Sequence, residues 1–253
     1  MLVELDLDGA VVLVTGGVRG VGLGITRAFL SAGAQVLTCA RRPAEVPGAS
    51  FARCDVRDAE QVSALVSGVV DRFGRLDVLV NNAGGAPFAL ADRASPRFHS
   101  KIVELNLLAP LLVAQAANAV MQTQPAGGAI VNVSSISGRR PSPGTAAYGA
   151  AKAGLDSLTA SLAVEWAPRV RVNALAVGMV RTEQSHLHYG SEAGIEAVAR
   201  TVPLGRLASP DEVGACAVFL ASPLASYVTG ATLVVHGGGE TPAFLTAAEE
   251  GSR

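Results

Sequence analysis

The chain has 253 residues and a net charge of −1, and 16% of its residues are charged. This length fits one large α/β domain better than two small ones, so we expect residues 1–253 to form a single domain. The near-neutral charge argues against nucleic acid or an anionic membrane as a partner, because both select for basic proteins. Hydrophobic residues make up 49% of the chain, which suits a parallel sheet buried on both faces or a surface hidden in an oligomer.

No segment is typical of a membrane span or a secretion signal. The most apolar long stretch, residues 105–120, is interrupted by a proline and three side-chain amides, whereas a span needs about 20 mostly apolar residues. Residues 1–8 are acidic and lack the basic start and apolar core of a signal peptide. The cysteines form no CxxC pair, and we expect reduced core thiols of a soluble, cytoplasmic protein at Cys39, Cys54 and Cys216.

Short β-branched runs alternate with longer helical patterns along the whole chain. The expected strands are residues 10–15, 35–39, 50–54, 77–80, 129–134, 170–176 and 232–235. The expected helices are residues 21–32, 58–73, 96–122, 145–166 and 210–221, with Asp58 as an N-cap and Gly74 as a stop signal. This alternation predicts an α/β fold: a Rossmann-like, doubly wound parallel sheet of about seven strands with helices on both faces.

Ligands of such sheets bind at the carboxyl ends of the strands, where the first turn of this chain is rich in glycine. The segment Thr15-Gly-Gly-Val-Arg-Gly-Val-Gly22 lies between the first strand and the first helix. Glycines at positions 16, 20 and 22 allow the backbone to approach a pyrophosphate, and the N-terminus of the following helix attracts its charge. The position of this turn, more than its glycines alone, predicts a dinucleotide site.

The end of the second strand indicates which dinucleotide is bound. An NAD(H) site requires a carboxylate there to accept a hydrogen bond from the ribose 2′-hydroxyl. This strand ends in Cys39-Ala-Arg41-Arg42, without an acid, and Arg19 of the glycine turn is expected to face the same place. Guanidinium groups bind a 2′-phosphate through forked hydrogen bonds, which favours NADP(H) over NAD(H). The alternative is that Arg41 and Arg42 are ordinary solvated residues.

A phenol and an ammonium group lie one turn apart in Tyr148-Gly-Ala-Ala-Lys152, and Lys152 is one of only two lysines in the chain. A neighbouring ammonium can lower the pKa of a phenol, which then exchanges a proton with a carbonyl or alcohol oxygen. Ser134 and Ser135 end the fifth strand at the same crevice, where a hydroxyl can hydrogen-bond the substrate oxygen. This arrangement predicts hydride transfer between a nicotinamide and a carbonyl or alcohol carbon.

These motifs together resemble the short-chain dehydrogenase/reductase family, in its single-domain branch, from about residue 7 to residue 239. TGGVRGVG (15–22) is similar to the family's glycine motif, CDV (54–56) to its adenine-side motif, and NNAG (81–84) is unchanged. ELN (104–106), VNVSSISG (131–138) and YGAAK (148–152) carry the remaining motif residues. The family resemblance selects Ser135 rather than Ser134, because Ser135 precedes the tyrosine by thirteen residues.

The resemblance implies a catalytic tetrad of Asn106, Ser135, Tyr148 and Lys152. Tyr148 would be the acid/base, Lys152 would hold the nicotinamide ribose, Ser135 would orient the substrate oxygen, and Asn106 would support a water-linked proton path. It also implies cofactor contacts from Gly16, Arg19, Gly20, Val21, Gly22, Arg41, Asp55, Val56, Asn82, Ala83, Gly84, Tyr148, Lys152, Gly178, Val180 and Thr182. Enoyl reductases of the superfamily separate their Tyr and Lys by more residues, so reduction of a C=C bond is not expected.

The chain departs from the family pattern at two places. Val177-Gly178 replaces the usual Pro-Gly after the sixth strand, which frees a φ angle and would leave the substrate loop more mobile or differently set. His236 replaces the Asp of an Asp-Gly-Gly motif, a change expected to affect a subunit contact rather than the chemistry. Both changes leave the tetrad intact.

The substrate is the least determined part of the prediction. Residues 183–201 would form a lid over it, and Phe88, Leu90, Ile136, Arg139 and Arg140 would line the mouth of the pocket. An apolar pocket with nearby guanidinium groups suits a 3-oxoacyl thioester or an alicyclic, steroid-like ketone, although residues 122–128 lack the basic side chains expected of a reductase of carrier-bound substrates. His186-x-His188 has no further metal ligands beside it, so no metal is expected.

Two functional classes stay open: a reductase or dehydrogenase of small molecules, and a catalytically idle NADP-binding sensor or partner subunit. The intact tetrad favours the enzyme. The resemblance further suggests a homotetramer built on the helices at 96–122 and 145–166 and on the last strand. The tail at 241–253 would cover a neighbouring pocket or be disordered.

Overall fold

Seven parallel strands form one sheet in the order β3-β2-β1-β4-β5-β6-β7 in the computed structural model, which describes residues 7–245. The strands are β1 (Val11–Thr15), β2 (Gln35–Ala40), β3 (Ser50–Arg53), β4 (Val78–Asn81), β5 (Gly128–Ser135), β6 (Val170–Val177) and β7 (Thr232–Val235). All seven predicted strands are present, with ends that shift by at most one residue. Because the order reverses between β1 and β4, a crevice is expected at their carboxyl ends.

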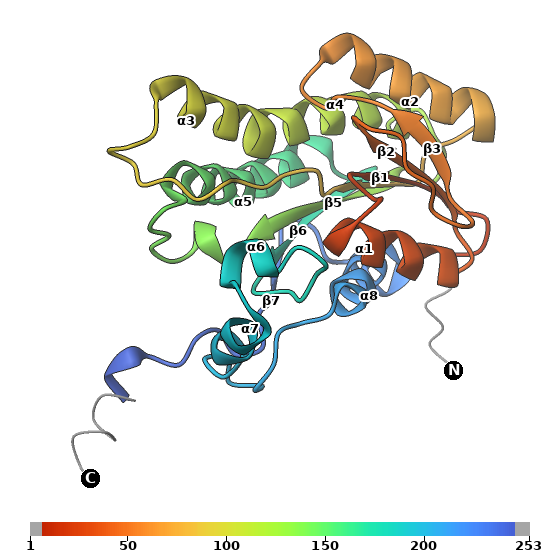
Figure 1. Cartoon of the computed structure of the whole chain (residues 1–253). Coiled ribbons are helices and arrows are strands. Elements are labelled where there is room, and N and C mark those ends of the chain that lie inside the picture. Colours follow the sequence, from red (N-terminus) through yellow and green to blue (C-terminus); the bar gives the residue numbers. More distant parts are fainter. Residues whose placement is uncertain (1–6, 246–253) are drawn as a thin grey trace.

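Helices cover both faces of this sheet, as predicted for a doubly wound single domain (Figure 1). The helices α2 (Ala59–Phe73), α4 (Ala109–Met121) and α5 (Ala146–Trp166) contribute to one apolar core, and α1 (Gly20–Ser31) and α8 (Pro210–Ala221) to the other. The central strand β1 supplies Leu13 to the first core and Val12 and Val14 to the second, because alternate side chains of a strand face opposite sides. The sequence signals at α2 are confirmed: the Asp58 side chain caps its first turn, and Gly74 ends it at φ +76°.

The long helix expected at residues 96–122 is divided by a π-turn. The helix α3 (Pro96–Val103) continues through Glu104–Leu108 in π-helical geometry before α4 begins at Ala109. Pro110 has no N–H group to donate to the carbonyl of Asn106, which explains why the regular hydrogen-bond pattern fails at this point. The π-turn buries Asn106 completely. A sequence reading based on periodicity alone missed this local widening.

By length and composition alone, the 26-residue segment Pro96–Met121 could cross a membrane. One side of it packs against the sheet, where Val113, Ala117 and Met121 belong to the core beneath β1 and β5. Only 39% of its apolar window is buried, so the interior of the fold accounts for part of its apolar character.

Two short helices that the sequence did not reveal fold over the carboxyl end of β6. They are α6 (His186–Tyr189) and α7 (Glu192–Ala199), which form most of the predicted lid segment. Ile195, Val202 and Leu207 give this segment a small apolar core of its own. Gly190, at φ +75°, separates the two helices, and each is too short to show a clear helical period. Most of the C-terminal tail that the sequence left uninterpreted, residues 246–253, lies outside the described residues, as do residues 1–6.

We predict that Gly24→Ala destabilises the fold, because α1 and α8 touch at this glycine. A Cβ atom on Gly24 would lie 2.3 Å from the carbonyl carbon of Pro210, so the two helices would have to separate, at a cost of about 1–3 kcal/mol. Gly68→Ala in the exposed middle of α2 is the matched control, since a Cβ atom there meets nothing within 4 Å. The control should stabilise by up to about 1 kcal/mol. Urea denaturation of both variants measures the difference, and equal effects would contradict this packing.

Candidate active site

The glycine turn after β1 is shaped for a close approach of a ligand to the backbone. Gly16 and Gly20 have φ angles of +65° and +52°, which side chains other than glycine disfavour. A Cβ atom on Gly22 would lie 2.2 Å from the carbonyl oxygen of Gly16, so this position also requires glycine. The helix α1 begins at Gly20, and Arg19 at its N-cap provides no side-chain hydrogen bond. The first N–H groups of α1 therefore fit an anionic group such as a pyrophosphate.

The NNAG segment after β4 is bound directly to this turn. The Asn82 Nδ2 donates to the carbonyl oxygens of Thr15 and Gly16, at 2.9 and 3.1 Å. The Thr15 hydroxyl accepts from the backbone N–H groups of Asn82 and Ala83, both at 3.0 Å, and donates to the Val80 carbonyl at 3.3 Å. Thr15 was not predicted as a site residue, although it opens the glycine motif. These bonds fix the position of both loops across the β1–β4 crevice.

Gly84 is the point at which three sequence motifs meet. A Cβ atom on Gly84 would lie 2.7 Å from Asn106 Oδ1 and 3.6 Å from Lys152 Nζ. Asn106 Oδ1 accepts from the Gly85 N–H at 2.8 Å, and its Nδ2 donates to the carbonyls of Gly85 and Ile102. The side-chain amide of Asn106 therefore holds the NNAG loop in place. Its backbone carbonyl receives no α-helical hydrogen bond, because Pro110, four residues later, has no N–H group.

Lys152 is buried, and its ammonium donates to the carbonyl of Val133 on β5 at 2.7 Å. The ammonium lies 5.6 Å from the centre of the Tyr148 ring, so the two side chains are neighbours. Burial lowers the pKa of Lys152 to about 8, and the nearby carboxylate of Asp156 partly opposes this shift. Asp156, one turn further along α5, was not predicted as a neighbour of the site.

The sequence predicts a lowered pKa for Tyr148, and the structure gives the opposite direction. Burial raises the pKa of the phenol, and the neighbouring Ser135 hydroxyl only partly offsets this effect. The residue pattern alone allowed either Ser134 or Ser135 to face the substrate, and the structure distinguishes them. Ser134 donates its hydroxyl to the Lys152 carbonyl at 3.2 Å, whereas the Ser135 hydroxyl accepts from the Ser137 N–H at 3.1 Å. Ser135 is thus the serine that reaches the phenol.

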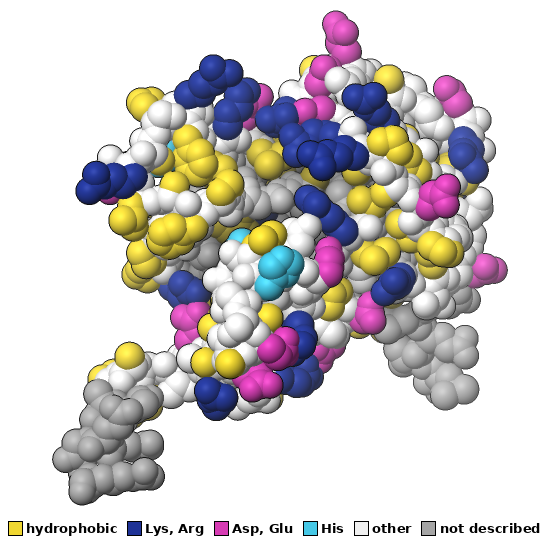
Figure 2. Space-filling view, in the orientation of Figure 1, with side chains coloured by type: hydrophobic (Ala, Val, Ile, Leu, Met, Phe, Trp, Pro, Cys, Tyr) yellow, Lys and Arg dark blue, Asp and Glu magenta, His cyan; other side chains and the backbone are white. Residues whose placement is uncertain are grey.

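Near the end of β2 lie three arginine side chains that have no carboxylate partner among the described residues. Arg19, Arg41 and Arg42 are exposed and form no ion pair with any described residue. Asp55 is bound at both oxygens by Arg57, at 2.9 and 2.5 Å, and this pairing lowers its pKa to about 2, with a smaller contribution from the charge of Arg41. Figure 2 shows basic side chains gathered at the upper margin of the hollow that crosses this face. Val56 belongs to the apolar core beside this region.

The segment after β6 joins the other side of the crevice. Val177 is buried and pairs with both Ser135 and Val235, and the Gly178 N–H donates to the Val235 carbonyl at 2.9 Å. Val177, which stands where the family usually has proline, is therefore fixed by pairing with both neighbouring strands, β5 and β7. A Cβ atom on Gly20 would lie 3.7 Å from Thr182 Cγ2, which places Thr182 beside the glycine turn.

Comparison with known proteins identifies the family to which this chain belongs. A family model described as enoyl-(acyl carrier protein) reductase matches residues 16–240. The L-fucose dehydrogenase of Oryctolagus cuniculus is 40% identical over 245 residues, which cover 92% of this chain and 85% of that protein. The chain belongs to the short-chain dehydrogenase/reductase family.

Two further relatives of this short-chain dehydrogenase/reductase have similar lengths. The galactitol 2-dehydrogenase of Agrobacterium fabrum is 35% identical, with 92% of this chain and 98% of that protein covered. The ligand-free structure of the Thermoplasma acidophilum aldohexose dehydrogenase has a TM-score of 0.89 and 30% identity, over 93% of this chain and 96% of that one. The protein is an NAD(P)-dependent oxidoreductase, and its relatives support action on alcohols.

The guanidinium groups expected at the substrate pocket of this short-chain dehydrogenase/reductase are both paired. Arg139 Nε donates to Asp156 Oδ2 at 3.0 Å, and Arg140 forms an ion pair with Glu240 at 2.6 Å. Each cation already has a carboxylate partner, so an anionic substrate group would have to compete with that acid and the reason for expecting one is weakened. A cavity of about 460 Å³ lies beside the second pair. The sequence did not single out four residues of its lining, namely Met179, Val198, Glu240 and Thr201.

A second cavity, of about 790 Å³, opens between the start of α1 and the lid segment, with Gly20 and Thr182 in its wall. Within residues 7–245, no group of three His, Cys, Asp or Glu side chains is arranged for a metal. The three cysteines are free thiols. Cys39 and Cys54 are buried and hydrogen-bonded to each other, and this contact raises the pKa of Cys39.

We predict that Lys152 makes the stability of the protein depend on pH. Its folded pKa of about 8 lies below the ordinary value of 10.5, so between these values the unfolded lysine binds a proton that the folded one has lost. The free energy of unfolding should therefore rise with pH across this window, by up to about 3 kcal/mol. Urea denaturation at pH 7.5 and pH 10 should show this rise in the wild type and lose it in Lys152→Met. Lys101→Met, which alters an exposed lysine, should retain it, and an unchanged rise in Lys152→Met would disprove the assignment.

Proposed function

We propose that this protein transfers hydride between NADP(H) and the carbon of a carbonyl or secondary alcohol, with Tyr148 as the acid/base. The observation that supports this most directly is the placement of Tyr148 beside Lys152 and Ser135 at the carboxyl ends of the central strands. The glycine turn fits a dinucleotide, because Gly16 and Gly20 adopt positive φ angles and the N-terminus of α1 that follows has no side-chain cap. When bound, the nicotinamide supplies or accepts the hydride.

Each residue of the predicted tetrad has a distinct part in this proposal. Ser135 hydrogen-bonds the substrate oxygen and orients it toward the phenol. The raised pKa of Tyr148 keeps its proton on at neutral pH, so the phenol donates that proton to a carbonyl oxygen in reduction and recovers it from an alcohol in oxidation. The ammonium of Lys152 holds ribose hydroxyls and stabilises the phenolate that results. The carbonyl of Asn106, without a donor at Pro110, binds a water that connects Lys152 to solvent.

The preference for NADP(H) follows from charge at the adenosine end. Arg41 and Arg19 are exposed and without ion-pair partners among the described residues, while the nearby carboxylate of Asp55 is paired with Arg57. A 2′-phosphate gains charge-assisted hydrogen bonds from free guanidinium groups. A ribose 2′-hydroxyl would find no free carboxylate there to accept its hydrogen bond.

We further propose a neutral substrate with several hydroxyl groups, of the sugar or polyol class for which the fucose, galactitol and aldohexose dehydrogenases are named. The ion pairs of Arg139 and Arg140 remove the support for a 3-oxoacyl thioester. An alicyclic, steroid-like ketone is the second candidate, because Phe88 and Leu90 leave apolar surface exposed near the crevice. Turnover with either class would exclude the idle sensor or partner subunit.

A cytoplasmic homotetramer is part of the same proposal. The helices at 96–122 and 145–166 and the strand β7 carry exposed apolar side chains that a partner would cover. Val164 is 80% exposed and Leu108 is 53% exposed. Sedimentation measurements determine the oligomeric state.

We predict that Tyr148→Phe reduces kcat by about 10²- to 10⁴-fold, the usual contribution of a general acid. NADPH binding, followed by fluorescence, should stay nearly unchanged because the ring and Lys152 remain. Tyr227→Phe is the matched control, since Tyr227 is fully exposed, and it should keep full activity. Turnover by Tyr148→Phe at the wild-type rate would place the acid at another residue.

We also predict that Arg41→Ala raises the KM for NADPH by about 10-fold or more, the effect of losing a hydrogen bond to a charged group. The KM for NADH should not change, because that cofactor lacks the 2′-phosphate. Arg97→Ala removes an exposed positive charge from α3 and controls for overall charge. A wild-type enzyme that prefers NADH would contradict the proposed cofactor.

A further inference from the structure

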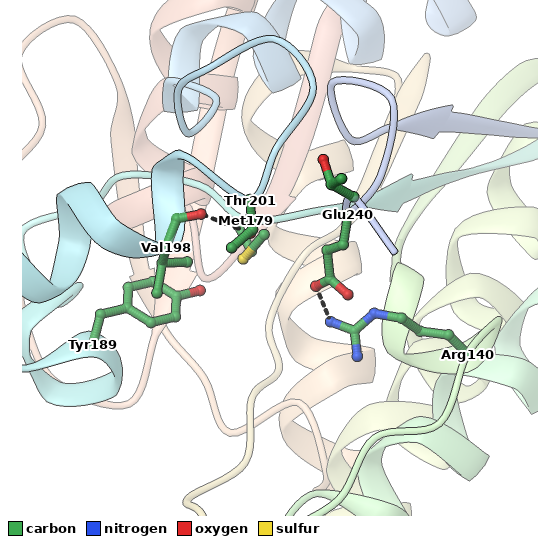
Figure 3. Close-up of a pocket in the computed structure, with 7 residues that line it drawn as sticks. Arg140, Met179, Tyr189, Val198, Thr201 and Glu240 are labelled. Atoms are coloured by element: carbon green, nitrogen blue, oxygen red, sulfur yellow. Dashed lines mark hydrogen bonds and ion pairs between the residues drawn. The ribbon is translucent and has the colours of Figure 1, made fainter. Parts of the chain in front are cut away.

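The cavity of about 460 Å³ lies between the lid segment and the chain that follows β7. Its size is within the range of small-molecule sites. Figure 3 shows Tyr189 and Val198 on one side, Arg140 and Glu240 on the other, and Met179 and Thr201 between them. The wall is therefore apolar on the lid side and charged on the opposite side.

This cavity lies close along the chain to the proposed reaction centre, although Ser135, Tyr148 and Lys152 are not among its lining residues. Arg140 follows Ser135 after a single 3₁₀ turn, Ile136–Gly138, at the carboxyl end of β5. Met179 lies between Gly178 and Val180 at the carboxyl end of β6, and Ser135 and Val177 are paired where these two strands end. A substrate that presents its oxygen to Ser135 would extend its other end toward Arg140.

The charged wall offers a donor and an acceptor side by side. Arg140 donates from one terminal nitrogen to Glu240 Oε1 at 2.6 Å, and from the other to the Pro141 carbonyl at 2.9 Å. Its Nε and the second oxygen of Glu240 form no hydrogen bond with any described residue. About one third of each side chain is exposed, so both groups can be reached.

The opposite wall carries a phenol. Burial raises the pKa of Tyr189, the charge of Glu240 adds to this shift, and Arg140 opposes it. The phenol therefore stays neutral, within the electrostatic reach of both members of the ion pair. Figure 3 shows its hydroxyl directed toward the centre of the cavity.

We infer that this cavity is a subsite for the hydroxyl groups of a neutral, polyhydroxylated substrate, with Arg140 and Glu240 as its hydrogen-bonding pair. The inference rests on the proposed function, since it assigns the far end of the same substrate. A hydroxyl group accepts from a guanidinium and donates to a carboxylate at the same time, so adjacent hydroxyls match the pair without separating it. The Tyr189 ring, Met179 and Val198 cover the carbon side of such a molecule.

Other substrate classes fit this wall less well. A carboxylate or phosphate would have to compete with Glu240 for Arg140 and would meet the charge of Glu240 at once. A purely apolar group would remove water from both charges and replace none of their hydrogen bonds. The ion pair therefore selects for uncharged groups that both donate and accept.

The test compares Glu240→Met and Arg140→Met with the wild type, using a hexitol and an aldose against cyclohexanol and 2-butanol as alcohols. Each variant should raise the KM for the polyhydroxylated compounds by about 10-fold or more, because hydrogen bonds to charged groups are lost. The kcat/KM for the simple alcohols should change by less than about 2-fold. Lys101→Met, which breaks the similarly exposed Lys101–Glu104 pair on α3, should leave all four substrates unaffected. Thermal unfolding confirms that each variant is folded.

Direct binding separates this inference from the proposed function. Saturation-transfer NMR of the hexitol with the NADP⁺-loaded protein should show binding in the wild type and loss of binding in Glu240→Met. If binding depends on Glu240 but no alcohol is turned over, the subsite stands and the proposed function fails. If alcohols are turned over but both variants discriminate among them as the wild type does, the subsite is disproved and the proposed function stands. Absence of hexitol binding to the wild type also disproves the subsite.

Discussion

A lysine ammonium enclosed at the carboxyl edge of the sheet is the constraint around which this site is built. Removing a positive charge from water costs free energy, and the shift in the pKa of Lys152 to about 8 reflects that cost. The charge is stabilised because the Val133 carbonyl accepts a hydrogen bond from the ammonium and the Asp156 carboxylate lies near it. Its position is fixed on a long helix whose first turns also carry Tyr148. The phenol and the ammonium are therefore carried by the same helix, one turn apart.

The neighbouring loops are held by amides rather than by charges. Asn82 binds the glycine turn through the carbonyls of Thr15 and Gly16, and Asn106 binds the NNAG loop through Gly85. Each amide supplies a donor and an acceptor in the geometry of a peptide group, so it can replace backbone pairing where the strands have ended. Glycines at positions 22 and 84 allow these contacts, because a side chain at either would collide with the partner. Within the described residues, these hydrogen bonds hold the two loops together at the floor of the crevice without a metal ligand or a disulfide.

Arginine serves two different purposes on the two sides of the crevice. At the adenosine end, Arg41 and Arg19 are left without carboxylate partners, which suits an anionic ligand. At the substrate end, Arg139 and Arg140 are each matched by an acid from another segment, which suits a neutral one. In the proposed function, the same side chain recognises a phosphate or presents a hydrogen-bonding wall, according to whether the fold brings an acid to it. This difference is invisible in the sequence, where both sites read as Arg-Arg.

The sequence by itself determined the order of strands and helices, the glycine turn, the NNAG and YGAAK motifs and the choice of family, because these depend on local periodicity, turn chemistry and short spacings. It could not decide the π-turn at Asn106 or the short lid helices, whose local signals are weak. It predicted a lowered pKa for Tyr148, whereas burial by segments distant in the chain raises it. Pairs such as Arg140 with Glu240, one hundred residues apart, were decided only by tertiary structure. An ion pair depends on distance in space, and no local pattern in the chain encodes that distance.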